Sequence, residues 1–413
     1  MSQEEAIPST TLSLDEINIA DPDFWLRDDV DGALALLREQ RPVSWHEHPA
    51  AGQGFWALTD SEDIAEANSD WTKFVSRHGV RIDHDPGTLH PGTGALVELD
   101  PPKHTANRAR VNSVFTPKQV RRLEGYVREQ AQRLVSQFSD GDEVDFIDQL
   151  ASPLPIEIVC DLVGVEKGPD RRMLMEYANV ARRDHELEYA DRPEAPAAAI
   201  RALRAYGLDL AAKKLLDPKD DLLSDLAQTK VDGEGISKEE LGGYFGLLIS
   251  AGSGTTRNAL AYGMLAFSQF PEQRRLYLEN QTALEMSMAD EVVRWASPLR
   301  IQGRIVDHDI EFRGVHMKKG QKVGMCYVAS NRDPKVFKNP FKFDITRDPN
   351  PHQSFGAGGP HFCLGRNLAR REIYVFFQSL FERFPKAEVI SKPVKERVIV
   401  GNGMRSMMVR LAS

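Results

Sequence analysis

In this 413-residue chain, Cys363 is the residue whose local sequence most strongly indicates chemical reactivity. It lies in the run FGAGGPHFCLG at residues 355–365, which leads directly into an amphipathic helical pattern over residues 366–384. A thiol at a helix N-terminus faces the positive end of the helix dipole and free backbone N–H groups, which favour its thiolate form. Such a thiolate can be a nucleophile, a metal ligand or a redox centre, whereas the bland interpretation is a buried cysteine in a turn.

The glycine content of the same run favours a binding site for a flat or bulky ligand. Four of its eleven residues are glycine, and glycine lets a backbone come close to a partner. The other cysteines, Cys160 and Cys326, are far apart and form no CxxC pair, which argues against zinc, iron–sulfur and disulfide frameworks. A single reactive thiol in a glycine-rich loop is therefore the feature to explain.

A second candidate is the run AGSGTT at residues 251–256, inside a long helical pattern. Ser237 and Glu240 form a capping box and Pro271 enforces a stop, so we predict a helix of about 33 residues and 50 Å. Its apolar character on all sides indicates burial. Internal glycines cost about 1 kcal/mol each. They indicate either a packing kink or a groove for a flat cofactor and a small substrate.

Two charged pairs have helical spacing. His104 and Arg108 are four residues apart after a proline pair that favours a helix start, and Glu291 and Arg294 are three apart. Alone, these patterns fit an exposed basic face and a solvated ion pair.

In this order along the chain, the motifs resemble the cytochrome P450 superfamily of haem-thiolate monooxygenases. Its cysteine loop has Phe, Gly, His, Cys and Gly at near-fixed spacing, which residues Phe355, Gly359, His361, Cys363 and Gly365 match. Phe355 lies eight residues before the cysteine, one more than the commonest spacing. This longer loop is similar to that of some bacterial members that act on branched lipids and sterols.

The resemblance implies a mainly α-helical fold with a smaller β region. Haem b would lie between the long central helix and the cysteine-loop helix, within one catalytic domain over residues 13–413 that follows a disordered tail over residues 1–12. Cys363 would be the iron ligand, and Glu291 with Arg294 would form a buried structural ion pair. The expected haem contacts are His104, Arg108, Ala251, Thr255, Arg304, Phe355, Gly356, His361, Cys363 and Gly365.

The same resemblance assigns proton delivery to Thr255, with Cys363 as the second catalytic residue. The family usually has an acidic residue before that threonine, but here the position is Gly254. Water with Ser253 or Thr256 would then carry the proton, another acid would reach in, or the chemistry is not ordinary hydroxylation. We favour a water chain through Thr255.

The expected substrate is a small or medium lipophilic molecule, such as a terpenoid, fatty acid or sterol. Segments 80–97, 247–251, 299–301 and 401–404 are the predicted pocket walls. Polar contacts could come from Asp83, Asp85, Arg300 or Gln302.

Electrons are expected from an external ferredoxin and its NAD(P)H-dependent reductase, because the chain has no flavin or nicotinamide fingerprint and ends soon after the cysteine helix. Arg366, Arg370 and Arg371 would form the docking patch, unless they are simply a solvated helix face. The alternatives are a peroxide-driven peroxygenase and a non-catalytic haem or lipid carrier.

Bulk properties exclude several other classes. A net charge of −9 gives no general affinity for nucleic acid or anionic membranes. The polar N-terminus and the lack of a long uncharged apolar run predict a cytoplasmic protein without a membrane anchor.

Overall fold

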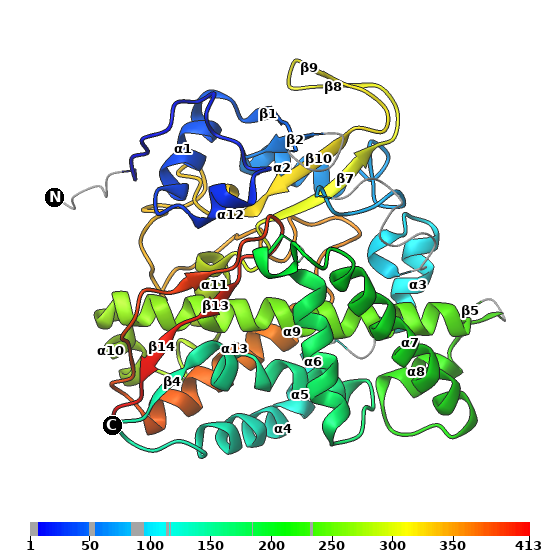
Figure 1. The fold of residues 1–413 in the computed structure, drawn as a ribbon, viewed down its shortest axis with the longest axis vertical. Helices are drawn as coiled ribbons and strands as arrows, with labels where there is room; N and C mark the ends of the chain where they lie inside the picture. Colours follow the sequence, from blue (N-terminus) through cyan, green and yellow to red (C-terminus); the bar gives the residue numbers. More distant parts are fainter. Residues whose placement is uncertain are drawn as a thin grey trace.

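The computed structural model describes residues 7–48, 54–83, 95–112, 115, 117–183, 185–231 and 234–413. A long helix, α9 (Lys238–Gln269), runs across the middle of the molecule (Figure 1). The largest sheet, which has five strands, lies on one side of α9 in the view of Figure 1, and the helices from α4 to α8 lie largely on the other. This helix-rich arrangement with small sheets confirms the predicted fold class.

The remaining helices are α1 (Val30–Gln40), α2 (Ser61–Ser69), α3 (Lys103–Asn112), α4 (Pro117–Val135), α5 (Pro153–Leu162), α6 (Pro169–Arg182), α7 (Ala195–Leu216), α8 (Leu222–Gln228), α10 (Pro271–Glu279), α11 (Glu285–Ala296), α12 (Tyr327–Ser330) and α13 (Arg366–Arg383). The strands are β1 (Val43–His46), β2 (Phe55–Leu58), β3 (Phe74–Val75), β4 (Glu143–Asp145), β5 (Lys230–Val231), β6 (Glu234–Gly235), β7 (Ile301–Val306), β8 (Ile310–Phe312), β9 (Val315–Met317), β10 (Lys322–Cys326), β11 (Glu388–Val389), β12 (Val394–Lys395), β13 (Met404–Ser406) and β14 (Met408–Arg410).

Helix α9 has the bounds that its capping signals predict. The backbone N–H of Glu240 donates to Ser237 Oγ at 3.1 Å, and the N–H of Ser237 donates to Glu240 Oε2 at 3.0 Å. The helix ends at Gln269, before Pro271 begins α10. It packs against α5, α7 and α11, and its apolar side chains belong to the largest core cluster. The prediction of a buried central helix is confirmed.

The largest sheet has the strand order β1-β2-β10-β7-β3. Strand β10 is parallel to β2 and antiparallel to β7. Strands β7 to β10 follow one another between residues 301 and 326, and Arg313 and Gly314, which form the turn between β8 and β9, both have positive φ. The sheet holds Arg304 of β7 beside the cysteine loop.

The last residues of the predicted N-terminal tail contact the folded domain. Thr10 Oγ1 and the backbone N–H of Thr11 donate to Asp29 at the start of α1, at 2.9 and 3.2 Å. Leu12 packs against a core cluster. The boundary at residue 13 is therefore wrong for these residues, and residues 1–6 lie outside the described part. In the described ranges, no helix has the length and apolar character needed to cross a bilayer.

Candidate active site around Cys363

The loop before α13 is closed by backbone contacts. The N–H of Cys363 donates to the carbonyl of Phe355 at 2.8 Å. Gly356, Gly358 and Gly359 have positive φ values of 88°, 98° and 74°. A Cβ on Gly359 would lie 2.2 Å from the carbonyl oxygen of Asn68, so no other residue fits there without moving the backbone. The glycines hold the loop in a conformation that presents the thiol.

The thiol of Cys363 is under opposing influences. Burial raises its pKa, while the backbone N–H groups of Gly365 and Arg366 and the guanidinium groups of Arg108 and Arg366 act to lower it. Burial is the largest of these influences and the pKa is raised overall, so the helix-start position does not by itself give the thiolate preference that the sequence predicts. The other cysteines are buried, and burial raises both of their pKa values to about 12, which makes them inert core residues.

A cavity of about 320 Å³ lies between α9 and the cysteine loop. Its walls are mainly apolar, with Leu247 and Leu248 of α9 and Val159 of α5 among them. All of the residues predicted to contact the cofactor line it: His104, Arg108, Ala251, Thr255, Arg304, Phe355, Gly356, His361, Cys363 and Gly365. The structure thus brings residues of the two glycine-rich motifs to the walls of one cavity.

A polar cluster occupies one edge of this cavity. The rings of His104 and His361 lie 4.2 Å apart, and neither ring nitrogen of buried His104 has a partner among the described residues. His361 Nε2 lies 3.1 Å from Ser76 Oγ. Arg304 is buried and donates to the carbonyl of Gly303, whereas Arg108 donates to the carbonyls of Pro360 and Phe362 in the cysteine loop.

The protein surroundings of the two histidines favour their neutral form. Burial lowers the pKa of His104 to about 4, with a further contribution from Arg108. Burial together with the charge of Arg304 lowers the pKa of His361 to about 2. Their N–H groups can therefore donate to an anion as neutral donors, and the positive charge at this edge comes from the arginines.

The hydroxyl groups of α9 bond back along the helix, as expected for internal Ser and Thr. Thr255 Oγ1 donates to the carbonyl of Ala251 at 2.7 Å, and Ser253 Oγ donates to that of Ile249 at 2.6 Å. Thr255 and Thr256 line the cavity, and Ser253 does not. A Cβ on Gly254 would meet Arg182 of α6 at 3.7 Å, so this position faces a guanidinium group.

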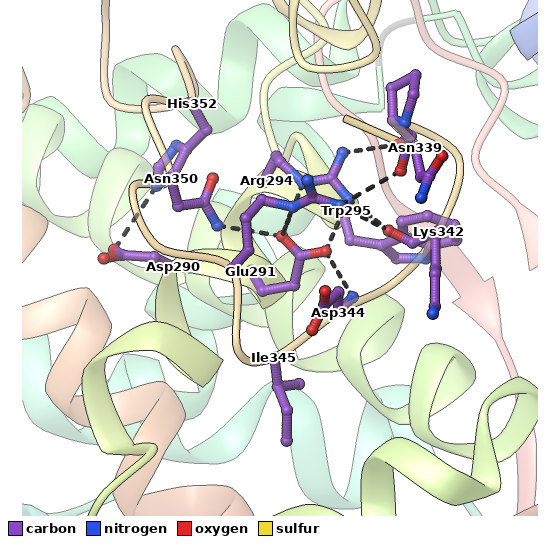
Figure 2. A network of polar contacts seen from close by, with 12 residues as sticks. Asp290, Glu291, Arg294, Trp295, Asn339, Lys342, Asp344, Ile345, Asn350 and His352 are labelled. Carbon is purple, nitrogen blue, oxygen red and sulfur yellow. Dashed lines mark hydrogen bonds and ion pairs between the residues drawn. The ribbon is translucent and has the colours of Figure 1, made fainter. Parts of the chain in front are cut away.

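Glu291 and Arg294 of α11 form a bidentate ion pair, with Nε–Oε2 and Nη2–Oε1 distances of 2.7 Å, and both side chains are fully buried (Figure 2). Arg294 also donates to the carbonyls of Asn331, Pro340 and Lys342. Glu291 also accepts from the Asp344 backbone and the Asn350 side chain. The pair fastens the segment before the cysteine loop to α11.

Sequence reasoning missed Glu372 of α13. Leu364, Leu368, Phe376 and Leu380 form one apolar row, and Glu372 is the member of that row between Leu368 and Phe376. Its side chain lines the cavity, is buried, and its Oε2 has no partner among the described residues. Burial raises its pKa well above the usual value. An acidic residue in an apolar row was the available signal.

We expect Glu372→Gln to raise the melting temperature, and to raise it more at pH 8 than at pH 5. The raised pKa means that the native state binds a proton which the unfolded chain releases above pH ~4.5. The penalty on the native state therefore grows with pH until the native carboxyl ionises. Thermal melts across that range test this, with exposed Glu382→Gln on the same helix as the control. A pH-independent difference would contradict it.

Comparisons with known proteins bear on what this cavity does. Residues 204–397 match the family model described as Cytochrome P450. The chain is 38% identical over 398 residues to a methyl-branched lipid omega-hydroxylase of Mycobacterium tuberculosis, which covers 94% of this chain and 93% of that relative. The chain belongs to the cytochrome P450 family. It is also 33% identical to a steroid C26-monooxygenase of Mycolicibacterium smegmatis, over 91% of this chain and 89% of that one.

Solved structures agree with this assignment. A Mycobacterium marinum cytochrome P450, CYP268A2, in complex with pseudoionone superposes with a TM-score of 0.90 at 32% identity, over 97% of this chain and all of that one. This P450 is therefore a monooxygenase of the haem-thiolate type.

The residues around the cavity fit a haem. A thiol at a helix start suits the iron, and the unpartnered nitrogens of His104 with the buried charge of Arg304 suit the anionic edge of the group. A Cβ built on Gly365 would meet nothing within 4 Å, so this glycine leaves open space at the cavity wall near Cys363.

Several predicted substrate contacts lie elsewhere. Gln302 lines the cavity, but Arg300 is buried against Trp25 and donates to Asn402, so it is a core residue. Asp83 pairs with Arg81 and His185. Asp85 lies outside the described residues. Segment 401–404 contributes no described residue to the cavity wall.

The predicted docking patch on α13 is largely neutralised within the protein. Arg370 pairs with Asp290 at 2.6 Å, and Arg371 pairs with Glu285 at 3.2 Å. Arg366 lies over the ring of Phe362, 4.8 Å from its centroid. The three arginines therefore do not present three free positive charges. The prediction failed because the sequence does not show that the acidic residues of α11 lie beside α13.

Proposed function

We propose that this P450 hydroxylates a lipophilic lipid, sterol-like or terpenoid substrate at a carbon held above haem b. The observation that carries the proposal is that Cys363 and Thr255 line the same largely apolar cavity. When bound through Cys363, the haem supplies oxygen activation, which a thiolate ligand favours by pushing electron density towards the iron. The relatives named for lipid and steroid oxidation support the substrate class.

The protein's own residues have separate roles in this proposal. Cys363 ligates the iron, and the N–H groups of Gly365 and Arg366 moderate the charge on its sulfur. Arg304, Arg108 and the two neutral histidines bind the haem carboxylates through hydrogen bonds. Apolar side chains such as Leu247, Leu248 and Leu299 orient the substrate and exclude water from the cavity.

Thr255 would hold and pass a proton from its hydroxyl, which lies at the cavity wall. Thr255→Ala should reduce product formed per electron pair by about tenfold or more, since a positioned proton donor is lost. The measurement is the ratio of product to NAD(P)H consumed. Ser253→Ala is the matched control, because that hydroxyl lies outside the cavity. An unchanged ratio for Thr255→Ala would remove the residue from the mechanism.

We further propose that an external ferredoxin, reduced by an NAD(P)H-dependent reductase, supplies the electrons to a cytoplasmic enzyme. A peroxygenase is the competing function, favoured by Gly254 at the usual acidic position. The two are separated by giving the protein either a ferredoxin system with NAD(P)H or hydrogen peroxide alone. Faster product formation with the ferredoxin system supports the first, and product with peroxide only supports the second.

A further inference from the structure

A second cavity of about 220 Å³ lies next to the first, between α6, α7 and α9. Val97 and Leu247 line both cavities, so the two spaces adjoin at these side chains. Gly246 of α9 lines the second cavity and leaves space there, since a Cβ built on it would meet nothing within 4 Å. Gly246 lies nine residues before Thr255, which places it roughly 14 Å along the helix from the proposed oxidation site.

The charge around this second cavity is unusual for a lipid site. Arg81, Arg182 and Arg204 line it, with Glu98 as the acidic residue of the described lining. Arg81 is paired with Asp83. Arg204, half-buried on α7, has no hydrogen-bond or ion-pair partner among the described residues. Because Arg204 is only half-buried, its guanidinium group keeps part of its hydration and is available to bind an anion that enters the cavity.

Arg182 adds to the excess of positive charge. It shares the buried carboxylate of Glu396 with Arg183 and Arg257, at distances of 3.3, 3.0 and 2.9 Å respectively. Three guanidinium groups therefore face one carboxylate. Nε of Arg182 is buried without a partner, and burial lowers its pKa only to about 9, so it stays charged at neutral pH. Gly254 leaves Arg182 without the carboxylate that an acidic residue there would supply.

We propose that the second cavity binds the carboxylate of a lipid substrate, held by Arg204 and Arg182, while the other end of the lipid lies beside Thr255. This inference rests on the proposed function. The planar fork of arginine matches a carboxylate and forms charge-assisted hydrogen bonds with it. The arrangement directs oxidation to the end of the chain farthest from the carboxylate.

The test compares a long-chain fatty acid with the primary alcohol of the same length, titrated into the haem-loaded protein and followed by the haem absorption spectrum. The proteins are wild type, Arg204→Gln, and Arg201→Gln as a control on the exposed face of α7. Wild type should bind the acid about tenfold or more tightly than the alcohol. Arg204→Gln should abolish that preference by weakening the acid alone, and Arg201→Gln should keep it.

An acid preference that is absent in wild type, or that survives in Arg204→Gln, would overturn the inference. Product analysis separates this failure from that of the proposed function. If both ligands are oxidised but binding shows no Arg204-dependent preference for the acid, the proposed function stands and the carboxylate site is rejected. If binding shows an Arg204-dependent preference for the acid but no oxidised product forms, the carboxylate site stands and the proposed function is rejected.

Discussion

Replacing Glu291 with alanine should give protein that holds little or no haem and unfolds at a much lower temperature. The substitution leaves the guanidinium of Arg294 fully buried without its carboxylate, and removing one member of a buried ion pair costs about 3–5 kcal/mol. It also removes the acceptor for the backbone N–H of Asp344 and for Asn350. The segment that leads to the cysteine loop would then lose its attachment to α11, and haem retention would fall with it.

The measurements are the ratio of haem to protein after purification and the thermal melt. Glu285→Ala is the matched control, because it lies on the same helix but pairs with Arg371 near the surface. Such partly exposed pairs contribute about 0–1 kcal/mol, so this variant should keep its haem. A Glu291→Ala protein with full haem content and an unchanged melt would show that the pair does not brace the site.

Cys363→Ser should fold but lose monooxygenase turnover altogether. The loop is closed by the backbone N–H of Cys363 and by glycine conformations, neither of which requires sulfur. A serine hydroxyl remains protonated at neutral pH and cannot supply the electron density of a thiolate ligand. The absorption spectrum of the reduced carbon monoxide complex, which differs between thiolate and neutral ligands, reports the change directly.

Cys160→Ala is the control for that experiment, since its thiol is buried in the core and does not line the cavity. It should retain the thiolate spectrum and turnover. Wild-type turnover by Cys363→Ser would exclude Cys363 as the iron ligand.

The fold and the main site were predictable because their signals are local. The capping box at Ser237, the stop at Pro271 and the glycines around Cys363 each act over a few residues, and the structure places these elements as those signals indicate. The longer cysteine loop also resembled that of members acting on branched lipids, and relatives with such names are found. The haem roles of the ten cavity residues stay predictions, although the structure gathers all ten.

Long-range charge pairing was not predictable. Arg370 and Arg371 look like a free basic face in the sequence, but Asp290 and Glu285 neutralise them from another helix. Glu396 lies 139 residues from Arg257, its nearest arginine partner, and no spacing rule joins them. The sequence predicts Arg300 as a polar contact for the substrate, yet its side chain is buried in the core against Trp25.

The pairing of β2 with β10 also constrains how the chain is made. Strand β2 ends at Leu58, but its parallel neighbour begins at Lys322. At roughly 5–20 residues per second on a ribosome, the interval between the two is roughly 10–50 s. During that time β2 has an open edge and an apolar face that the native sheet will cover, which is an opportunity for aggregation. Slow translation or a shortage of chaperones should therefore reduce the yield of this protein, because the first sixty residues can aggregate before the rest of the haem site is synthesised.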